Sequence, residues 1–298
     1  MKIFKIHRFL HAVVLAAVFM SAEPEVSAQT SDFQRRYDLL VSRVGHSGIG
    51  VETLIKDWEK ADSTNRSMLV AKFDFYFSKS QKEVVVTKSQ QKYLGMDPLL
   101  SLQDSLGKKV YYFREMTYDD ELFSQALKTA ERLVALYPDE LDHHFTKANA
   151  LVAYEKENPD MAYAYLSDMI KLDQERQKPW NYEGKKMEPG FFADAIQEYC
   201  REFYAVGSQA SMKAFCDLSM NMSKLYPQET CFISNVATYY LVAEDDPKAA
   251  LKYYGKVLKK VKNDEVALRN SLVAARKAGN KKLQAKYRQA LIDYGYMK

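Results

Sequence analysis

The sequence predicts a mainly α-helical protein in which pairs of helices stack into an α-solenoid. From residue 120 to the C-terminus, apolar residues recur at intervals of three and four, which is the period of an amphipathic helix. Two of these helical stretches end in the same Leu-Tyr-Pro sequence, at Pro138 and at Pro227, which are 89 residues apart. The 11 Gly and 8 Pro in 298 residues are too few for a loop-rich β-sandwich. Internal similarity of this kind is typical of repeat proteins.

The overall charge balance argues against a nucleic-acid-binding protein. The chain has 43 Lys and Arg against 39 Asp and Glu, a net charge of +4. This excess is too small to indicate a surface for nucleic acid. Hydrophobic residues make up 47% and charged residues 28%, the balance of a soluble globular protein.

The first 28 residues have the layout of a secretory signal peptide. Three basic residues precede an apolar run over residues 9–22, and Val26 and Ala28 place small side chains before a cleavage site at Gln29. The apolar run is short for a membrane span, although an uncleaved anchor is the alternative. The first cysteine is Cys200, so the pattern of a lipoprotein is absent. We therefore expect an exported protein, periplasmic or secreted, with no membrane span after cleavage.

The three cysteines allow at most one disulfide bond in an oxidising compartment. Cys200, Cys216 and Cys231 each lie in an apolar helical context, where cysteine acts as a small hydrophobic residue. One interpretation is three unpaired structural thiols. The alternatives are a Cys200–Cys216 bridge or a reactive thiol.

Residues 29–120 differ from the rest and are expected to form N-terminal helices followed by a β-hairpin. The periodicity predicts three helices, over residues 31–44, 51–62 and 64–80. Ser31 and Thr64 are candidate N-caps, and Gly45 is a candidate stop. Residues 83–87 are rich in β-branched side chains, and residues 99–103 and 109–113 flank a turn at 104–107. This hairpin is expected to cap the first repeat.

Residues 121–298 are expected to form the repeat domain. The predicted helices cover residues 122–137, 141–154, 161–172, 208–226, 231–241, 248–261, 264–277 and 281–293. A long loop at 173–190 interrupts them and carries Trp180 and Tyr182. Long loops in compact domains are often functional.

The spacing of small and aromatic residues in this domain resembles the tetratricopeptide repeat (TPR) family. One unit has Ile233, Val236, Ala237 and Tyr240 on its first helix and Ala250, Tyr254 and Val257 on its second. The units at 145–169 and 268–290 follow the same pattern. The layout of the whole chain resembles a group of exported bacterial TPR-like proteins. The resemblance implies stacked helix pairs with a concave surface that binds an extended peptide or a partner protein.

No motif in the sequence indicates catalysis, a metal or a cofactor. The chain contains no phosphate-binding glycine loop and no GxSxG. His143 and His144 are adjacent, so on a helix they point about 100° apart and cannot share a metal. We expect them to be exposed at a helix start, and His46 to lie in a connection between helices. The chain is therefore expected not to be an enzyme.

Four lysines follow helical spacing in the C-terminal part. Lys248, Lys252, Lys256 and Lys259 would lie along one face of a helix. Either this face is only solvated, or it binds an anion or an acidic peptide.

These observations predict a non-catalytic protein- or peptide-binding scaffold of the bacterial cell envelope. We expect Asn149, Asn235 and Arg269 to face the groove, with Trp180 and Tyr182 at its rim. A different interpretation of Trp180 is that it pins the long loop to a helix. The alternative functions are a glycan-associated protein, in which Trp180 and Tyr182 stack on sugar, and an enzyme without a recognisable motif.

Overall fold

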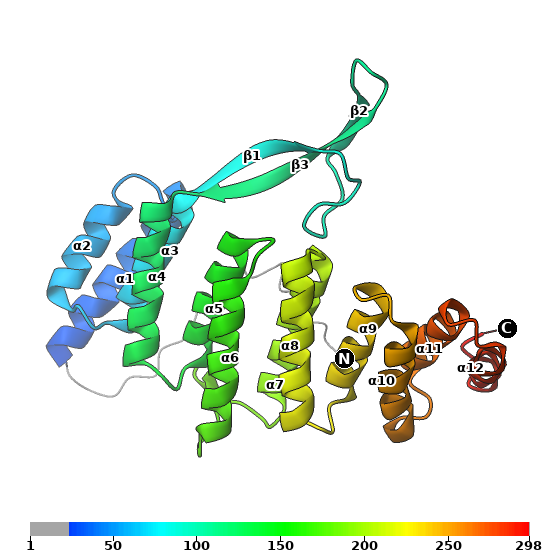
Figure 1. Cartoon of the computed structure of the whole chain (residues 1–298). Helices are drawn as coiled ribbons and strands as arrows, with labels where there is room; N and C mark the ends of the chain where they lie inside the picture. Colours follow the sequence, from blue (N-terminus) through cyan, green and yellow to red (C-terminus); the bar gives the residue numbers. More distant parts are fainter. Residues whose placement is uncertain (1–23, 298) are drawn as a thin grey trace. The chain divides into compact units, whose positions relative to one another are not determined.

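The computed structural model describes residues 24–297, and the prediction of a mainly helical chain is confirmed (Figure 1). The chain divides into two compact units. Unit 1 contains the residues up to Tyr154 together with Lys178–Met187, and unit 2 contains Glu155–Gln177 and the residues from Glu188 onward. The signal-peptide prediction falls largely on residues 1–23, which lie outside the described residues, and it stays a prediction.

Five helices begin within the described residues of unit 1. They are α1 (Pro24–Val44), α2 (Val51–Ala61), α3 (Arg66–Ser80), α4 (Asp120–Leu136) and α5 (Leu141–Glu155). The predicted stop at Gly45 is confirmed, since α1 ends at the preceding residue and Gly45 has a φ of +77°. Both predicted N-caps are wrong. Ser31 lies inside α1, and Asn65 caps α3 because the Thr64 hydroxyl donates to Asp62 instead.

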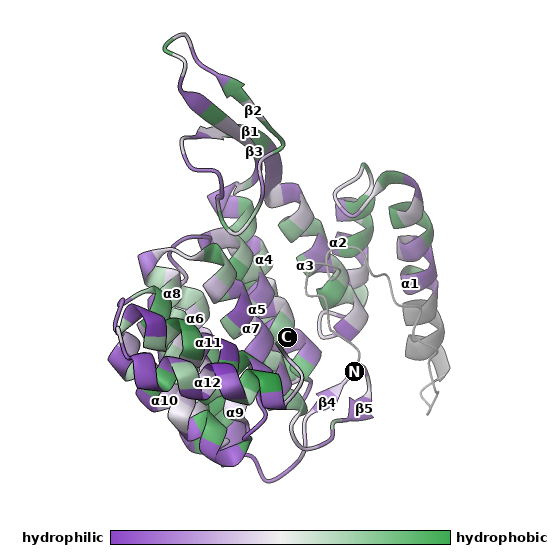
Figure 2. Cartoon of the chain, turned by 90° about the vertical axis from the view of Figure 1, so that its right-hand side faces the viewer, coloured by the Kyte–Doolittle hydropathy of each residue, from purple (hydrophilic) through white to green (hydrophobic). Residues whose placement is uncertain are grey.

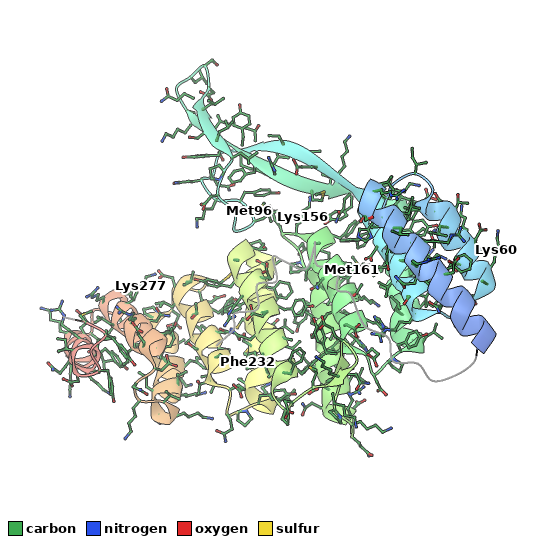
Figure 3. All side chains as sticks on the ribbon, turned by 180° about the vertical axis from the view of Figure 1, so that it is seen from behind. Lys60, Met96, Lys156, Met161, Phe232 and Lys277 are labelled. Atoms are coloured by element: carbon green, nitrogen blue, oxygen red, sulfur yellow. The ribbon has the colours of Figure 1, made fainter. Side chains whose placement is uncertain are left out.

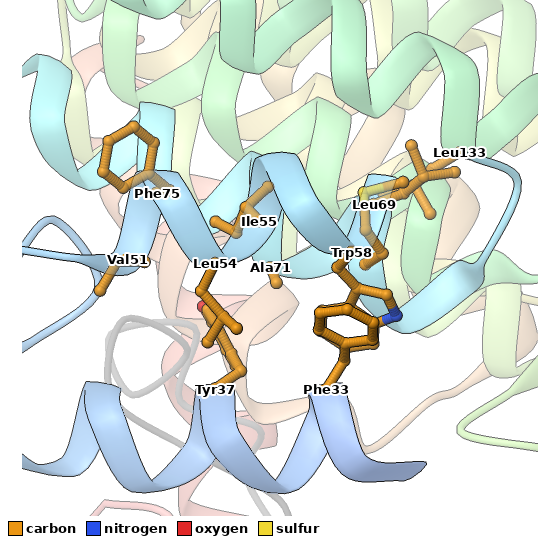
Figure 4. Close-up of a cluster of buried hydrophobic side chains, with 11 residues drawn as sticks. Phe33, Tyr37, Val51, Leu54, Ile55, Trp58, Leu69, Ala71, Phe75 and Leu133 are labelled. Atoms are coloured by element: carbon orange, nitrogen blue, oxygen red, sulfur yellow. The ribbon is translucent and has the colours of Figure 1, made fainter. Parts of the chain in front are cut away.

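The first core of unit 1 joins α1 to α4. Figure 4 shows its eleven buried side chains, which are Phe33, Tyr37, Val51, Leu54, Ile55, Trp58, Met68, Leu69, Ala71, Phe75 and Leu133. Trp58 is fully buried, and its ring stacks on Phe33 with a centroid distance of 6.0 Å. The second tryptophan of the chain, Trp180, also belongs to unit 1. Tryptophan fluorescence therefore reports on the folding of unit 1 alone.

The turn between α1 and α2 has room for only a glycine at position 48. A Cβ atom on Gly48 would lie 2.3 Å from Val44 Cγ2 and 2.4 Å from the Val44 carbonyl oxygen. We expect Gly48→Ala to lower the free energy of unfolding by about 2 kcal/mol, because backbone must move to relieve the clash. Urea denaturation followed by tryptophan fluorescence measures this loss.

Gly45 in the same turn provides a matched control. Its φ is +77°, but no atom lies within 4 Å of a Cβ built on it, so Gly45→Ala adds only backbone strain of about 1 kcal/mol. A larger loss for Gly45→Ala than for Gly48→Ala would contradict the steric argument.

A three-stranded antiparallel sheet is inserted between α3 and α4. Its strands are β1 (Gln81–Lys88), β2 (Leu100–Gln103) and β3 (Lys109–Tyr118), in the order β1-β3-β2. The predicted hairpin is confirmed as β2–β3, and β1 adds a third strand with Val86 opposite Phe113. Figure 1 shows the sheet extending away from the α3–α4 pair. Strand β2 is exposed at all four residues, and the expectation that the hairpin caps the first repeat stays a prediction.

Unit 2 is a run of stacked helices. They are α6 (Asp160–Glu175), α7 (Phe191–Val206), α8 (Gln209–Leu225), α9 (Thr230–Val242), α10 (Pro247–Lys260), α11 (Glu265–Lys277) and α12 (Lys281–Asp293). From α7 onward each helix packs on the next, while α6 contacts α8, α7 contacts α9 and α9 contacts α11. Alternate helices therefore share a layer, which confirms the predicted solenoid arrangement within this unit.

The TPR-like spacing corresponds to real packing positions in α9–α11. The small residues Ala237, Ala250, Ala267 and Ala274 are buried together with Tyr254 and Val257 in one core. Tyr254 is fully buried, and its hydroxyl lies 2.8 Å from Thr238 Oγ1 and 3.0 Å from Asn270 Nδ2. The small residues allow the helices to approach, and the tyrosine links α9, α10 and α11 through its ring and hydroxyl.

Candidate binding surfaces

The long loop between α6 and α7 packs against α5. Residues 178–187 of this loop belong to unit 1, as α5 does. It contains the two short strands β4 (Asn181–Tyr182) and β5 (Lys185–Lys186), which pair antiparallel. Trp180 is only 5% exposed and meets His144 edge-on at a centroid distance of 5.1 Å. Tyr182 is half-buried, 6.1 Å from the Phe145 ring. This arrangement matches the pinning interpretation of Trp180, and the buried indole presents no open ring face for a sugar to stack on.

Asn235 links two helices of unit 2. Its Nδ2 donates to Gln197 Oε1 at 2.8 Å and to Ser219 Oγ at 3.1 Å. In the other direction, Gln197 Nε2 donates to Asn235 Oδ1 over a longer distance of 3.4 Å. The amide of this predicted groove residue is thus engaged by α7 and α8, which gives it a structural role.

The Asn235–Gln197 contact predicts a measurable coupling. We expect Asn235→Ala to lower the free energy of unfolding by about 2 kcal/mol, because the half-buried Gln197 and the fully buried Ser219 each lose a hydrogen-bond partner. The double variant Gln197→Ala, Asn235→Ala should lose about 1 kcal/mol less free energy of unfolding than the sum of the losses of the two single variants. Chemical denaturation followed by circular dichroism tests this, with the exposed Gln209→Ala as a control. Additive losses would contradict the contact.

The remaining predicted groove residues lie in different units. Arg269 on α11 is exposed, and its guanidinium donates to Glu265 and to the Tyr296 carbonyl oxygen, both at 2.7 Å. It therefore holds the segment after α12 against α11.

Asn149 is half-buried on α5 in unit 1 between the buried Ala148 and Ala150. Asn149, Trp180 and Tyr182 belong to unit 1, whereas Asn235 and Arg269 belong to unit 2. Their role in partner binding stays a prediction.

The expectation of exposed histidines at the start of α5 is wrong. His143 is 2% and His144 is 3% exposed. Arg66, at the start of α3, donates from Nε to His143 Nε2 at 2.8 Å. His144 Nε2 lies 3.1 Å from the Pro138 carbonyl oxygen. Arg66 is 77 residues away from His143 in the chain, so the local sequence contains no sign of this contact.

Arg66 is the centre of a polar cluster in unit 1, which we call the Arg66 cluster and define as Arg66, Glu140, Asp142 and His143. The Arg66 Nη2 atom donates to Asp142 Oδ2 at 2.7 Å and lies 3.4 Å from Glu140 Oε2. Asn181 donates to Glu140 Oε1 at 3.0 Å, which ties the loop to the cluster. Glu140 Oε2 and Asp142 Oδ1 are buried and accept no hydrogen bond.

Burial determines the protonation of His143. It lowers the pKa of this imidazole to about 4, while Asp142 raises the pKa and the charges of Arg66 and His144 lower it further. His143 is therefore neutral at pH 7, and its Nε2 can accept the Arg66 hydrogen bond. Among residues 24–297, no three His, Cys, Asp or Glu side chains are grouped as metal ligands.

All three cysteines are free thiols. Cys200 and Cys216 are buried, and Cys231 is half-buried. Burial raises the pKa of both Cys200 and Cys216 to about 12 and that of Cys231 to about 11. The thiols are therefore protonated at neutral pH and are poor nucleophiles, which fits the interpretation of three structural residues.

The sheet has a concentration of exposed apolar side chains that the sequence analysis did not identify. We call Val85, Met96, Leu99, Leu100, Leu102 and Leu106 the sheet patch. Leu106, in the turn before β3, is 85% exposed, and Leu102 on β2 is 56% exposed. Figure 3 labels Met96 in the loop that precedes β2. Grouped exposed apolar residues often mark an interaction site.

A cleft of about 380 Å³ lies on unit 2 between α6 and α8. Ser167 and Lys171 of α6 and Asn221 and Lys224 of α8 contribute to its lining. The Ser167 hydroxyl donates to the Tyr163 carbonyl oxygen at 2.8 Å. Within residues 24–297, no helix has an apolar stretch long enough to cross a bilayer.

Comparison with known proteins found no matching family model and no matching curated protein. Among solved structures, the chain is similar to MamA (13% identity, TM-score 0.36, covering 58% of this chain and 82% of that one). It is also similar to PilW, a widely conserved type IV pilus biogenesis factor (12% identity, TM-score 0.37, covering 93% and 97%). A third is YrrB, a TPR protein with an unusual peptide-binding site (12% identity, TM-score 0.36, covering 84% and 98%). The TPR-like character of this chain rests on the packing of α9–α11.

Proposed function

We propose that this protein is a non-catalytic scaffold that binds a partner protein through the sheet patch. The observation that carries the proposal is the exposed apolar side chains of an inserted sheet, among them Leu100 and Leu102, which point to the same face of β2. The proposal keeps the protein-binding role expected from the sequence and places the main contact on the sheet. The predicted groove is less suited to it, since Asn235 is engaged within the protein and Trp180 is buried.

The β2 edge suggests how the partner binds. In the order β1-β3-β2, strand β3 is central and β2 has one unpaired edge. Natural sheets usually protect such edges with charge, proline or a bulge. The four residues of β2, Leu100–Gln103, carry no charge. An extended apolar segment of the partner can pair with this edge through its backbone and cover Leu100 and Leu102.

The proposal includes a place in the cell. The basic, apolar and small-residue segments of residues 1–28 support export to the periplasm or beyond the cell. N-terminal sequencing of the protein from its own host tests this, with Gln29 expected as the first residue. An intact Met1 on the membrane-bound protein would contradict it.

Capture followed by a binding measurement tests the proposed contact. The native chain and a Leu100→Lys, Leu102→Lys variant are immobilised, and envelope extract of the host is passed over both. The control is Val266→Lys, Val273→Lys, which changes two exposed valines of α11. We expect the captured partner to bind the sheet variant roughly tenfold or more weakly and to bind the control as it binds the native chain.

Hydrogen exchange on the complex identifies the mode of binding. We expect new protection of the backbone amides of residues 100–103 when the partner is bound. Equal binding of the partner to the native chain and the sheet variant, without this protection, would show that the sheet patch is not the site.

A further inference from the structure

Charge is divided unevenly along unit 2. Residues 188–246, which contain α7–α9, have nine Asp and Glu against three Lys and Arg, a net charge of −6. Residues 247–297, which contain α10–α12, have thirteen Lys and Arg against three Asp and Glu, a net charge of +10. Figure 2 shows hydrophilic residues along much of α10 and α12. The C-terminal end is therefore strongly cationic, although the net charge of the whole chain is small.

The predicted lysine stripe lies on the exposed face of α10. Lys248, Lys252, Lys256 and Lys259 are all exposed, and we call them the α10 lysine face. The helix buries the opposite side through Ala250, Tyr254 and Val257. The lysine side chains therefore project into solvent along about 16 Å of helix.

No acidic side chain neutralises the α10 lysine face. Within the described part of the chain, no carboxylate lies within ion-pair distance of its four ammonium groups, although Lys256 rests on the Tyr253 ring at 4.5 Å. Other cations of unit 2 are paired, including Lys213 with Asp217 and Lys277 with Asp245, both at 2.6 Å. The lysines at i, i+4 spacing repel one another, and an external anion bound to them would relieve this repulsion.

We propose that the α10 lysine face binds a short acidic segment of a polypeptide. Lysines four residues apart on a helix are about 6 Å apart along its axis. Alternate side chains of an extended strand are about 6.6 Å apart on one face. An extended segment with a Glu or Asp at every second position therefore places one carboxylate near each ammonium group.

Two features favour an acidic peptide over a longer polyanion. The net charge of −6 on residues 188–246 of the same unit repels a membrane surface or nucleic acid that extends beyond α10–α12. The face also has no free aromatic platform for bases, because Tyr253 stacks on Tyr240 at 5.4 Å. This surface belongs to unit 2 and is independent of the sheet patch in unit 1.

Direct binding of a defined probe tests the proposal. The probe is a fluorescent synthetic peptide of Glu-Ser repeats, and a Gln-Ser peptide is its neutral control. The test variant replaces Lys248, Lys252, Lys256 and Lys259 by Gln in the full chain. The matched control replaces four exposed lysines of unit 1, Lys56, Lys60, Lys92 and Lys108, by Gln. Circular dichroism verifies that both variants remain folded.

We expect the α10 variant to bind the acidic peptide roughly tenfold more weakly, while the control variant binds it as the native chain does. Binding to the native chain should weaken between about 10 and about 150 mM salt. Equal weakening in both variants would show attraction by net charge only and would overturn the proposal. Tighter binding of duplex DNA or of phosphatidylglycerol vesicles than of the peptide would also overturn it.

Discussion

Replacement of Trp180 by alanine is expected to lower the free energy of unfolding of unit 1 by about 4 kcal/mol. The indole is 5% exposed and packs edge-on against His144, so its removal leaves a cavity beside α5. Asn181, the next residue, donates to Glu140, and this contact weakens when the loop is no longer held. Urea denaturation followed by the fluorescence of the remaining Trp58 measures the loss.

Two observations separate this structural role from the binding role predicted from the sequence. Trp180→Phe should retain most of the stability, because a phenyl ring fills much of the same space. Trypsin should cut Trp180→Ala faster after Lys185 or Lys186 in the loop, since the loop detaches more often. Unchanged stability and unchanged cleavage, together with weaker partner binding, would restore Trp180 as a contact residue.

Elements with a strong local period were predicted well from the sequence. The predicted helix over residues 281–293 is confirmed with the same bounds as α12, and the hairpin turn at 104–107 is confirmed between β2 and β3. No helix was predicted over residues 191–206, which form α7, because this stretch lacks the repeat spacing. The cap of α3 was placed one residue early because Asn65 and Thr64 both favour caps, and only the Asp62 contact decides between them.

The candidate site was harder to predict because its properties arise from long-range contacts. The exposure of a side chain on a helix depends on which helix or loop covers it. His143 accepts a hydrogen bond from Arg66, 77 residues away, and Asn235 is engaged by Gln197, 38 residues away. The sheet patch is a different case, since the leucines of residues 99–106 suit a buried strand equally well. Their exposure follows only from the position of β2 at the edge of a projecting sheet.

The Arg66 cluster gives the second large expected effect. We expect Arg66→Met to lower the free energy of unfolding of unit 1 by about 3 kcal/mol at pH 7.5. Methionine fills part of the volume but leaves Glu140 and Asp142 without their cation, and each already has a buried oxygen with no hydrogen bond. This expected loss of stability is at the low end of the range for breaking a buried ion pair, because the Arg66 side chain is 37% exposed.

The pH dependence of this loss identifies its cause. In the native chain the pKa of His143 is about 4, compared with 6.5 for an unperturbed histidine. The unfolded state therefore binds more protons between these pH values, and native stability falls as the pH is lowered from 6.5 to 4. In Arg66→Met the lowering effect of Arg66 is removed and the raising effect of Asp142 remains, so the pKa of His143 rises. A protonated His143 can then pair with Asp142, 3.7 Å away.

We therefore expect the difference in stability between the native chain and Arg66→Met to shrink from pH 7.5 to pH 5. Fluorescence-monitored urea denaturation at both pH values measures it. Lys60→Met removes a cation that is 78% exposed and pairs only at the surface with Asp57, so it should cost little at either pH. A difference that stays constant with pH would mean that Arg66 acts through packing alone. A shrinking difference would show that the Arg66 charge adds to the effect of burial in lowering the pKa of His143. Arg66 would then couple the start of α3 electrostatically to the start of α5.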